Sequence, residues 1–171
     1  SPEEKNSGKI KDQMKNSTLC YIESCGKYLM LRRDRKKNDE NSGKWIGVGG
    51  KFEEGESPDD CLIREVREET GFELTSYRLR GIVTFVSDIY ETEQMFLFTA
   101  TADGGVSGGL PGCDEGTLEW VKISDVPALP LWEGDRIFLS LLSEGRGFFL
   151  LKLCYRGDRL VSALLDGREI L

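Results

Sequence analysis

The sequence contains no histidine among its 171 residues. This absence excludes mechanisms that require a histidine base and zinc sites that require a histidine ligand. The five cysteines are scattered and form no C-x-x-C pair, so neither a zinc ribbon nor a disulfide framework is indicated. Acid–base chemistry therefore falls to carboxylates, lysine, tyrosine or metal-bound water, and we expect the reduced thiols of a cytoplasmic protein.

Long hydrophobic runs and an excess of positive charge are also missing. No stretch is apolar enough to cross a membrane, and no secretory signal pattern is visible. The net charge of −7 argues against a broad electrostatic grip on DNA or RNA. We therefore expect neither a membrane nor polymeric nucleic acid as a partner, whereas a small polyanion that arrives with metal ions remains compatible.

The length of the chain fits one domain with a sizeable core. Residues 1–13 are polar and are predicted to be a disordered leader or an expression remnant. Residues 14–171 are predicted to form a single domain, which we expect to be a monomer or a homodimer.

The stretch GKFEEGESPDDCLIREVREETGF, residues 50–72, contains the clearest local signals in the chain. A helix is predicted over residues 58–70, with a proline at its first position. Ser57 is placed to cap this helix, and Asp60 stands where a capping-box acid belongs. Gly71 suits a left-handed stop at the other end.

The predicted helix places three carboxylates on one face, because Glu65, Glu68 and Glu69 stand at positions i, i+3 and i+4. Like charges this close repel each other, so compensation is needed. Two interpretations stay open at this point. A solvated acidic face could be held by Arg64 and Arg67, or hard divalent cations such as Mg²⁺ could bind the carboxylates.

The other segments predict strands and one further helix. Strand-like runs cover residues 18–23, 28–33, 45–50, 77–87, 94–102, 117–122, 148–155 and 160–165. Hairpins are predicted for the first two runs and the last two, and a long antiparallel pair for residues 77–87 and 94–102. An amphipathic helix is predicted over 135–143, after a short turn or helix at 124–130. This pattern indicates an α+β fold with a mixed β-sheet between helices.

The complete spacing G-x5-E-x7-R-E-U-x-E-E-x-G-U, where U is apolar, resembles the signature of the Nudix hydrolases at every fixed position. The resemblance implies an α/β/α sandwich and a loop–helix–loop that holds Mg²⁺ or Mn²⁺. It also implies that the Gly50 carbonyl is a metal ligand, that Arg64 orients the glutamates and that Glu56 ties the loop to the helix. Three glutamates would bind metal and handle the attacking water: Glu65, Glu68 and Glu69.

Segments outside this stretch resemble the bacterial, streptococcal-type branch of the MutT-type enzymes that hydrolyse oxidised purine nucleotides. These segments are KWIGVGGK, CDEGTLEWV and LWEGD, in residues 44–51, 113–121 and 131–135. The resemblance implies that Glu115 adds an acidic ligand to the metal site and that Lys51 contacts the substrate. An ordinary loop acid is the alternative for Glu115.

The resemblance further implies that Trp132 stacks on a purine and that Asp135 binds its edge. A core tryptophan and a helix N-cap are the alternatives for these two residues. Ile46 stands where the animal enzymes of this type have an asparagine, so another group must read the base edge. In the basic run of residues 32–37, a solvated loop is expected, although Arg32 or Arg33 could face the phosphates.

The function implied is Mg²⁺-dependent hydrolysis of a nucleoside triphosphate, with 8-oxo-dGTP converted to 8-oxo-dGMP and pyrophosphate. Its cellular role would be removal of 8-oxo-dGTP before polymerases incorporate it. The first alternative is a Nudix enzyme with another substrate, such as CTP, a nucleotide sugar or the 5′ end of RNA. The second is a non-catalytic, nucleotide-sensing Nudix domain, although such domains commonly lose glutamates that are all present here.

Overall fold

A computed structural model of the chain describes residues 14–33, 43–103 and 116–171. The predicted leader, most of the basic run and Glu115 lie outside the described residues. Within the described residues, no helix is long and apolar enough to pass through a bilayer.

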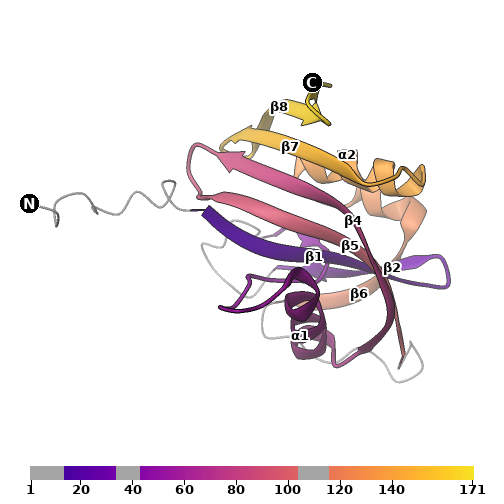
Figure 1. Cartoon of the computed structure of the whole chain (residues 1–171). Helices are drawn as coiled ribbons and strands as arrows, with labels where there is room; N and C mark the ends of the chain where they lie inside the picture. The colour runs from indigo at the N-terminus through magenta and orange to yellow at the C-terminus, as the bar shows by residue number, and fades with distance from the viewer. Residues whose placement is uncertain (1–13, 34–42, 104–115) are drawn as a thin grey trace, which may run out of the picture.

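The described residues form one mixed sheet (Figure 1). Its strands are β1 Met14–Ser24, β2 Lys27–Arg32, β3 Trp45–Ile46, β4 Glu73–Ser87, β5 Thr92–Asp103, β6 Thr117–Lys122, β7 Phe149–Arg156, β8 Arg159–Leu165 and β9 Arg168–Glu169. The spatial order is β3-β2-β1-β5-β4-β7-β8-β9, and β6 pairs with β2. The β1–β5 and β4–β7 pairs are parallel and the other pairs are antiparallel, so the predicted mixed sheet is confirmed.

Two α-helices cover opposite faces of this sheet (Figure 1). They are α1 Pro58–Thr70 and α2 Glu133–Ser143, and a 3₁₀ helix, η4 Ile123–Ala128, precedes α2. Successive residues of β1 alternate between the two faces. Leu19 and Tyr21 belong to the core under α2, whereas Cys20 and Ile22 belong to the core under α1. The predicted sandwich of helix, sheet and helix is confirmed.

Helix α1 has the predicted bounds and the predicted ends. The Ser57 hydroxyl accepts a hydrogen bond from the Asp60 amide at 3.2 Å, and the Asp60 carboxylate accepts one from the Ser57 amide at 3.1 Å. Gly71 adopts a left-handed conformation with φ of 75° and donates its amide to the Arg67 carbonyl. These local contacts satisfy backbone groups that would otherwise lack partners, and so fix where the helix starts and stops.

The strand predicted over residues 45–50 is shorter in the structure, because β3 ends at Ile46. Beyond it the chain pairs with β1 through two isolated bridges, Val48 with Cys20 and Lys51 with Ser17, and through further backbone hydrogen bonds at Gly50 and Phe52. A Cβ atom at Gly47 would lie 2.5 Å from the Cys20 carbonyl oxygen. The loop can therefore run closely alongside β1, and this path brings the Lys51 carbonyl within hydrogen-bonding distance of Arg64 in α1.

Candidate active site

Arg64 is the centre of the polar network at the loop and helix α1. Its Nε and Nη2 atoms donate to the two carboxylate oxygens of Glu56 at 2.7 and 2.8 Å. Its Nη1 atom donates to Glu65 Oε1 at 2.8 Å and to Glu68 Oε2 at 3.3 Å. Nη2 also donates to the Lys51 carbonyl at 3.1 Å. One guanidinium thus joins the loop to two glutamates of the helix.

These contacts test whether Arg64 and Arg67 both compensate the acidic face of α1. Hydrogen bonds from Arg64 and from the Glu53 amide lower the pKa of Glu56 to about 2, so Glu56 stays ionised. Arg64 does contact Glu68, but it donates two shorter hydrogen bonds to Glu56. Arg67 instead pairs with Glu73 of β4, at 2.9 Å. The interpretation in which both arginines hold the acidic face is therefore wrong for Arg67.

The three glutamates of α1 differ in exposure. Glu69 is only 8% exposed, and its Oε2 atom accepts a hydrogen bond from the Gly49 amide at 3.4 Å. Glu68 is exposed, whereas Glu65 lines a pocket. Among the described residues, no three acidic or cysteine side chains stand together as a ready-made metal site. Glu65 and Glu68 are turned towards Arg64 instead.

The oxygen atoms around Gly50 fit a hard divalent cation by their chemistry, since Mg²⁺ and Mn²⁺ prefer carboxylate and carbonyl ligands. A Cβ atom at Gly50 would lie 2.5 Å from the Glu65 carboxyl carbon, so loop and helix meet without room for a side chain. The Gly50 carbonyl accepts hydrogen bonds from the Thr18 amide at 2.9 Å and the Cys61 thiol at 3.4 Å. The Gly50 carbonyl and the Glu65 carboxylate are therefore the oxygen atoms of the loop and the helix that would hold such a cation together.

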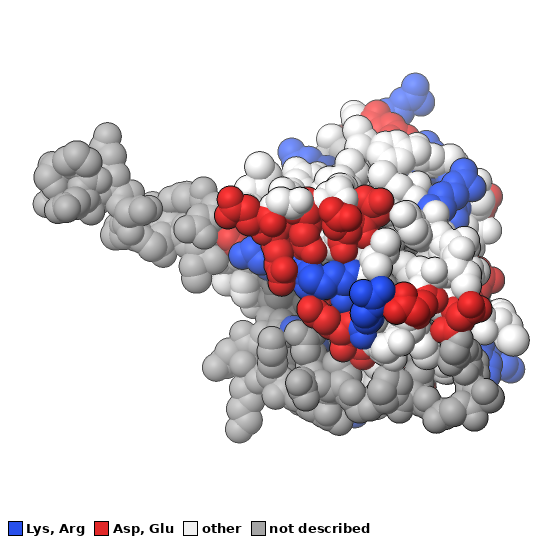
Figure 2. Space-filling view, turned by 60° about the horizontal axis from the view of Figure 1, so that its bottom comes forward, with Lys and Arg blue, Asp and Glu red and all other residues white. Residues whose placement is uncertain are grey.

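The molecular face brought forward in Figure 2 carries acidic side chains that flank a smaller group of basic ones. On this face the coloured basic residues form no broad continuous surface. The prediction that polymeric nucleic acid is not a partner stays a prediction.

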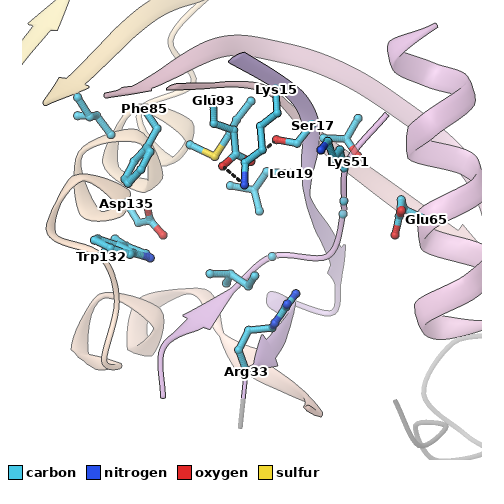
Figure 3. A pocket seen from close by; sticks show the side chains of 17 residues that line it. Lys15, Ser17, Leu19, Arg33, Lys51, Glu65, Phe85, Glu93, Trp132 and Asp135 are labelled. Carbon is cyan, nitrogen blue, oxygen red and sulfur yellow. Dashed lines mark hydrogen bonds and ion pairs between the residues drawn. The ribbon is translucent and has the colours of Figure 1, made fainter. Parts of the chain in front are cut away.

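A pocket of about 410 Å³ extends from the loop to helix α2 (Figure 3). Lys51, Glu65 and the glycines of the loop line one end. Trp132, Asp135 and Phe85 line the other end. The structure therefore brings both predicted base-contacting residues into the same cavity as the predicted metal ligands Gly50 and Glu65 and the predicted substrate contact Lys51, although the two groups are more than sixty positions apart in sequence.

Trp132 belongs both to the core and to the pocket. It is 5% exposed and meets Phe85 and Tyr155 edge-on, at ring-centroid distances of 5.5 and 5.0 Å. The Lys44 ammonium lies 4.3 Å from the centroid of the same ring, which is a cation–π contact. The two interpretations of Trp132 therefore do not exclude each other.

Asp135 is a buried acid inside the first turn of α2. The N-cap of the helix is Trp132, so the alternative that made Asp135 the N-cap is wrong. Burial raises the pKa of Asp135 to about 8, and the negative charge of Glu93 adds to this rise. At neutral pH its carboxyl group is therefore protonated and can both donate and accept a hydrogen bond.

Several residues that line the pocket were missed by the sequence reasoning. The missed residues are Lys15, Ser17 and Glu93. Ile46 and Arg33, which the sequence analysis had named, also line the pocket. Arg33 had been considered as a phosphate contact, and its place in the pocket keeps that prediction open. The alternation of Tyr21 and Leu19 along β1, continued backwards, was the signal that could have found Ser17 and Lys15. Glu93 was missed because the predicted strand started one residue later.

Comparison with known proteins identifies relatives over most of the chain. The NUDIX domain model matches residues 15–142. An uncharacterised Nudix hydrolase, YvcI, of Bacillus subtilis (strain 168) is 34% identical over 157 residues, which cover 90% of this chain and 95% of that protein. The oxidized purine nucleoside triphosphate hydrolase of Danio rerio is 30% identical over 131 residues, 77% of this chain and 81% of that protein.

A solved structure shows the same architecture. The MutT protein from Bacillus halodurans matches with a TM-score of 0.76 at 30% identity, and the match covers 89% of this chain and 97% of that one. The family model includes the whole loop–helix stretch of residues 50–72, where the Arg64 network lies. Motif, fold and relatives agree, and the chain belongs to the Nudix family of hydrolases.

Proposed function

We propose that the protein hydrolyses a purine nucleoside triphosphate in the presence of Mg²⁺ or Mn²⁺, with 8-oxo-dGTP as the preferred substrate. Nudix hydrolases act on phosphorus anhydrides of nucleotides and generally use divalent metal ions. One observation carries the proposal: a single pocket joins Glu65 of the Nudix box, the motif of residues 50–72, to the buried side chains of Trp132 and Asp135 at the start of α2. These two ends of the pocket match the two ends of a nucleoside triphosphate, which are a polyanionic phosphate chain and a planar base.

At the phosphate end, the chain supplies oxygen ligands and positive charge. Glu65, Glu68 and Glu69 would hold the cation, with the Gly50 carbonyl as a further ligand. A bound Mg²⁺ supplies charge neutralisation and a water of lowered pKa. One of the three carboxylates takes the proton of the attacking water, since no histidine is available. Lys51 lies at the same end of the pocket, where its ammonium would attract the phosphates.

Arg64 contacts two of these three carboxylates. It holds Glu65 and Glu68 from one side and the loop from the other, through Glu56 and the Lys51 carbonyl. These contacts fix the distance between the Gly50 carbonyl of the loop and the carboxylates of the helix. One cation can contact both only at a suitable distance. Hydrolysis is therefore expected to depend on Arg64 even though Arg64 need not touch the substrate.

At the base end, Trp132 and Phe85 form an aromatic wall and Asp135 provides the polar group. A protonated carboxyl can donate to a purine carbonyl oxygen while its own carbonyl accepts from a ring N–H. Ile46 lines the pocket but has no hydrogen-bonding side chain. Asp135 therefore provides the hydrogen bonds to the base edge that an asparagine at position 46 would provide. The Danio rerio relative, named for oxidised purine triphosphates, supports this choice of substrate.

A hydrolysis screen tests the proposal. The protein with Mg²⁺ is given 8-oxo-dGTP, dGTP, dATP, CTP, a nucleotide sugar and a capped RNA 5′ end, and kcat/KM is measured for each. We expect 8-oxo-dGTP to exceed dGTP by at least about tenfold, the size of one differential hydrogen bond. A higher kcat/KM for CTP, the sugar nucleotide or the RNA would overturn the assignment of the base, and no hydrolysis at all would favour a sensing role.

The base site is tested with Asp135→Ala rather than with Trp132→Ala. Truncating Trp132 removes a core side chain and is expected to cost about 3–5 kcal/mol of stability, which would confuse the kinetics. Asp135→Ala removes both the donor and the acceptor of the carboxyl group and should narrow the preference for 8-oxo-dGTP over dGTP. Asp125→Ala is the control, because Asp125 lies in η4 and does not line the pocket.

A further inference from the structure

Three polar side chains form a cluster on the wall of the pocket that neither the box nor the base site uses. The Ser17 hydroxyl donates to Glu93 Oε2 at 2.5 Å, and the Lys15 ammonium lies 3.5 Å from Glu93 Oε1. Lys15 and Ser17 come from β1 and Glu93 comes from β5, where Lys15 and Glu93 are direct partners in the parallel register. We call Lys15, Ser17 and Glu93 the Glu93 cluster.

The cluster is placed between the two ends of the pocket. Figure 3 shows Glu93 and Lys15 between Asp135 on one side and Lys51 on the other. Ser17 is bridged to Lys51 through the backbone, which fixes the cluster beside the phosphate end. The charge of Glu93 also acts on Asp135, so the cluster lies within electrostatic reach of the base end.

The side chain of Glu93 is largely enclosed, with 15% of its surface exposed, and Lys15 is 20% exposed. Each carboxylate oxygen already has one partner, so the side chain is held in a fixed position. A carboxylate oxygen can accept two hydrogen bonds, so Glu93 keeps acceptor capacity on the wall of the pocket that it lines. A fixed carboxylate on a pocket wall favours a ligand group that donates hydrogen bonds.

The parts of a nucleotide can be matched to this charge. A phosphate beside Glu93 would meet a like charge, which is unfavourable at short distance. A purine ring fits the aromatic wall at the far end. The sugar lies between base and phosphates in every nucleotide, and its hydroxyl groups are hydrogen-bond donors. Therefore the sugar is the part that complements the Glu93 cluster in both position and chemistry.

We propose that Glu93, held by Ser17 and Lys15, accepts a hydrogen bond from a sugar hydroxyl and so determines the sugar specificity of the enzyme. This inference rests on the proposed function, because it requires a nucleoside triphosphate in the pocket. It adds a residue outside the Nudix box that selects the substrate rather than reacts with it.

The test compares substrates with and without the hydroxyl. The kinetic constants are measured for 8-oxo-dGTP and its 2′,3′-dideoxy analogue, and for dGTP and ddGTP, on the wild type, Glu93→Ala and Glu93→Gln. Glu91→Ala is the matched control, since Glu91 also pairs with Lys15, at 3.9 Å, but does not line the pocket. Circular dichroism melting checks that each variant is folded at the assay temperature.

We expect Glu93→Ala to lower kcat/KM at least about tenfold for each deoxynucleotide and to leave the dideoxynucleotides nearly unchanged. The loss should appear mainly in KM, and Glu93→Gln, which keeps an acceptor oxygen, should recover part of it. Glu91→Ala should behave as the wild type. Because Glu93→Gln preserves the shape of the side chain, it carries the test if Glu93→Ala does not fold.

Equal losses for the deoxy and dideoxy substrates would overturn the sugar contact and leave Glu93 a structural ion pair. A change in the preference between 8-oxo-dGTP and dGTP, without dependence on the hydroxyl, would also overturn it and move Glu93 to the base site. Failure of the proposed function has a different readout, because the wild type would then hydrolyse none of the four triphosphates or would prefer another nucleotide in the hydrolysis screen.

Discussion

At the scale of single residues, two arginines on the same helix have different surroundings. Arg64 is 21% exposed at its side chain and contacts the loop and two box glutamates. Arg67 is 59% exposed and pairs with Glu73 only through a surface contact. Spacing along the helix did not distinguish the two arginines, because it does not show that Glu56 folds back from the loop. Only the family resemblance gave Arg64 a separate role.

This difference makes Arg64→Ala an informative variant. We expect kcat to fall by about 100-fold or more, since misplaced catalytic groups lose roughly that much rate. Arg67→Ala should keep kcat and change the free energy of unfolding by less than about 1 kcal/mol, as for exposed ion pairs. Steady-state kinetics and urea melts of the two variants check this. Similar rates for both variants would show that Arg64 only solvates the helix face.

Asp135 shows how burial changes the chemistry of a residue. Its pKa is near 3.9 in an unfolded chain and about 8 in the folded protein. Between these values the folded state holds a proton that the unfolded state lacks. The stabilisation from this group is therefore complete below about pH 4 and is lost as the pH rises through about 8.

The pH dependence is measured against Asp135→Asn, which cannot titrate. From pH 4 to 8, the unfolding free energy of the wild type should fall relative to that of the variant, by at most about 1.4 kcal/mol per pH unit. Glu93, Lys44 and Arg136 also act on this carboxyl, but they are present in both proteins. Denaturant melts at several pH values provide the comparison, and a constant difference would mean that the carboxyl is ionised throughout.

At the scale of elements, helix α1 was predictable and the loop before it was not. The capping box of Ser57 and Asp60 and the left-handed Gly71 are local signals, and they fixed both ends of the helix correctly. The loop depends on pairing with β1, which no local pattern encodes, and β3 was predicted too long for the same reason. Helix α2 was predicted to start at residue 135 rather than at Glu133, because its N-cap, Trp132, makes no side-chain capping hydrogen bond that a sequence pattern could indicate.

The close contact of loop and helix predicts the effect of Gly50→Ala. The new methyl group would meet the Glu65 carboxyl at 2.5 Å. Glu65 can swing away at little cost in stability, but it then leaves the position from which it would bind the cation. We expect kcat to fall at least about tenfold, while the melting temperature changes little.

Gly147→Ala is the control, because nothing lies within 4 Å of a Cβ atom at that position. An unchanged kcat in Gly50→Ala would show that Glu65 does not take part in cation binding.

At the scale of the whole molecule, the sheet brings the two halves of the site together. The parallel β1–β5 pair places Lys15 beside Glu93, and the parallel β4–β7 pair lies under α2, which carries Asp135. Composition and periodicity predicted the strands and the sandwich, but these pairings join residues far apart in sequence. The Glu93 cluster and the shared pocket could therefore be found only after the sheet was assembled.

Phosphorus-31 NMR tests the central claim, that the box carboxylates support cation-dependent hydrolysis of a nucleoside triphosphate, most directly. The wild-type protein is mixed with 8-oxo-dGTP and Mg²⁺, spectra are recorded over time, and the sample is repeated with a chelator in excess. We predict that the triphosphate signals give way to those of a monophosphate and pyrophosphate with Mg²⁺ and persist with the chelator. Release of orthophosphate instead, or equal turnover under chelation, would contradict the claim.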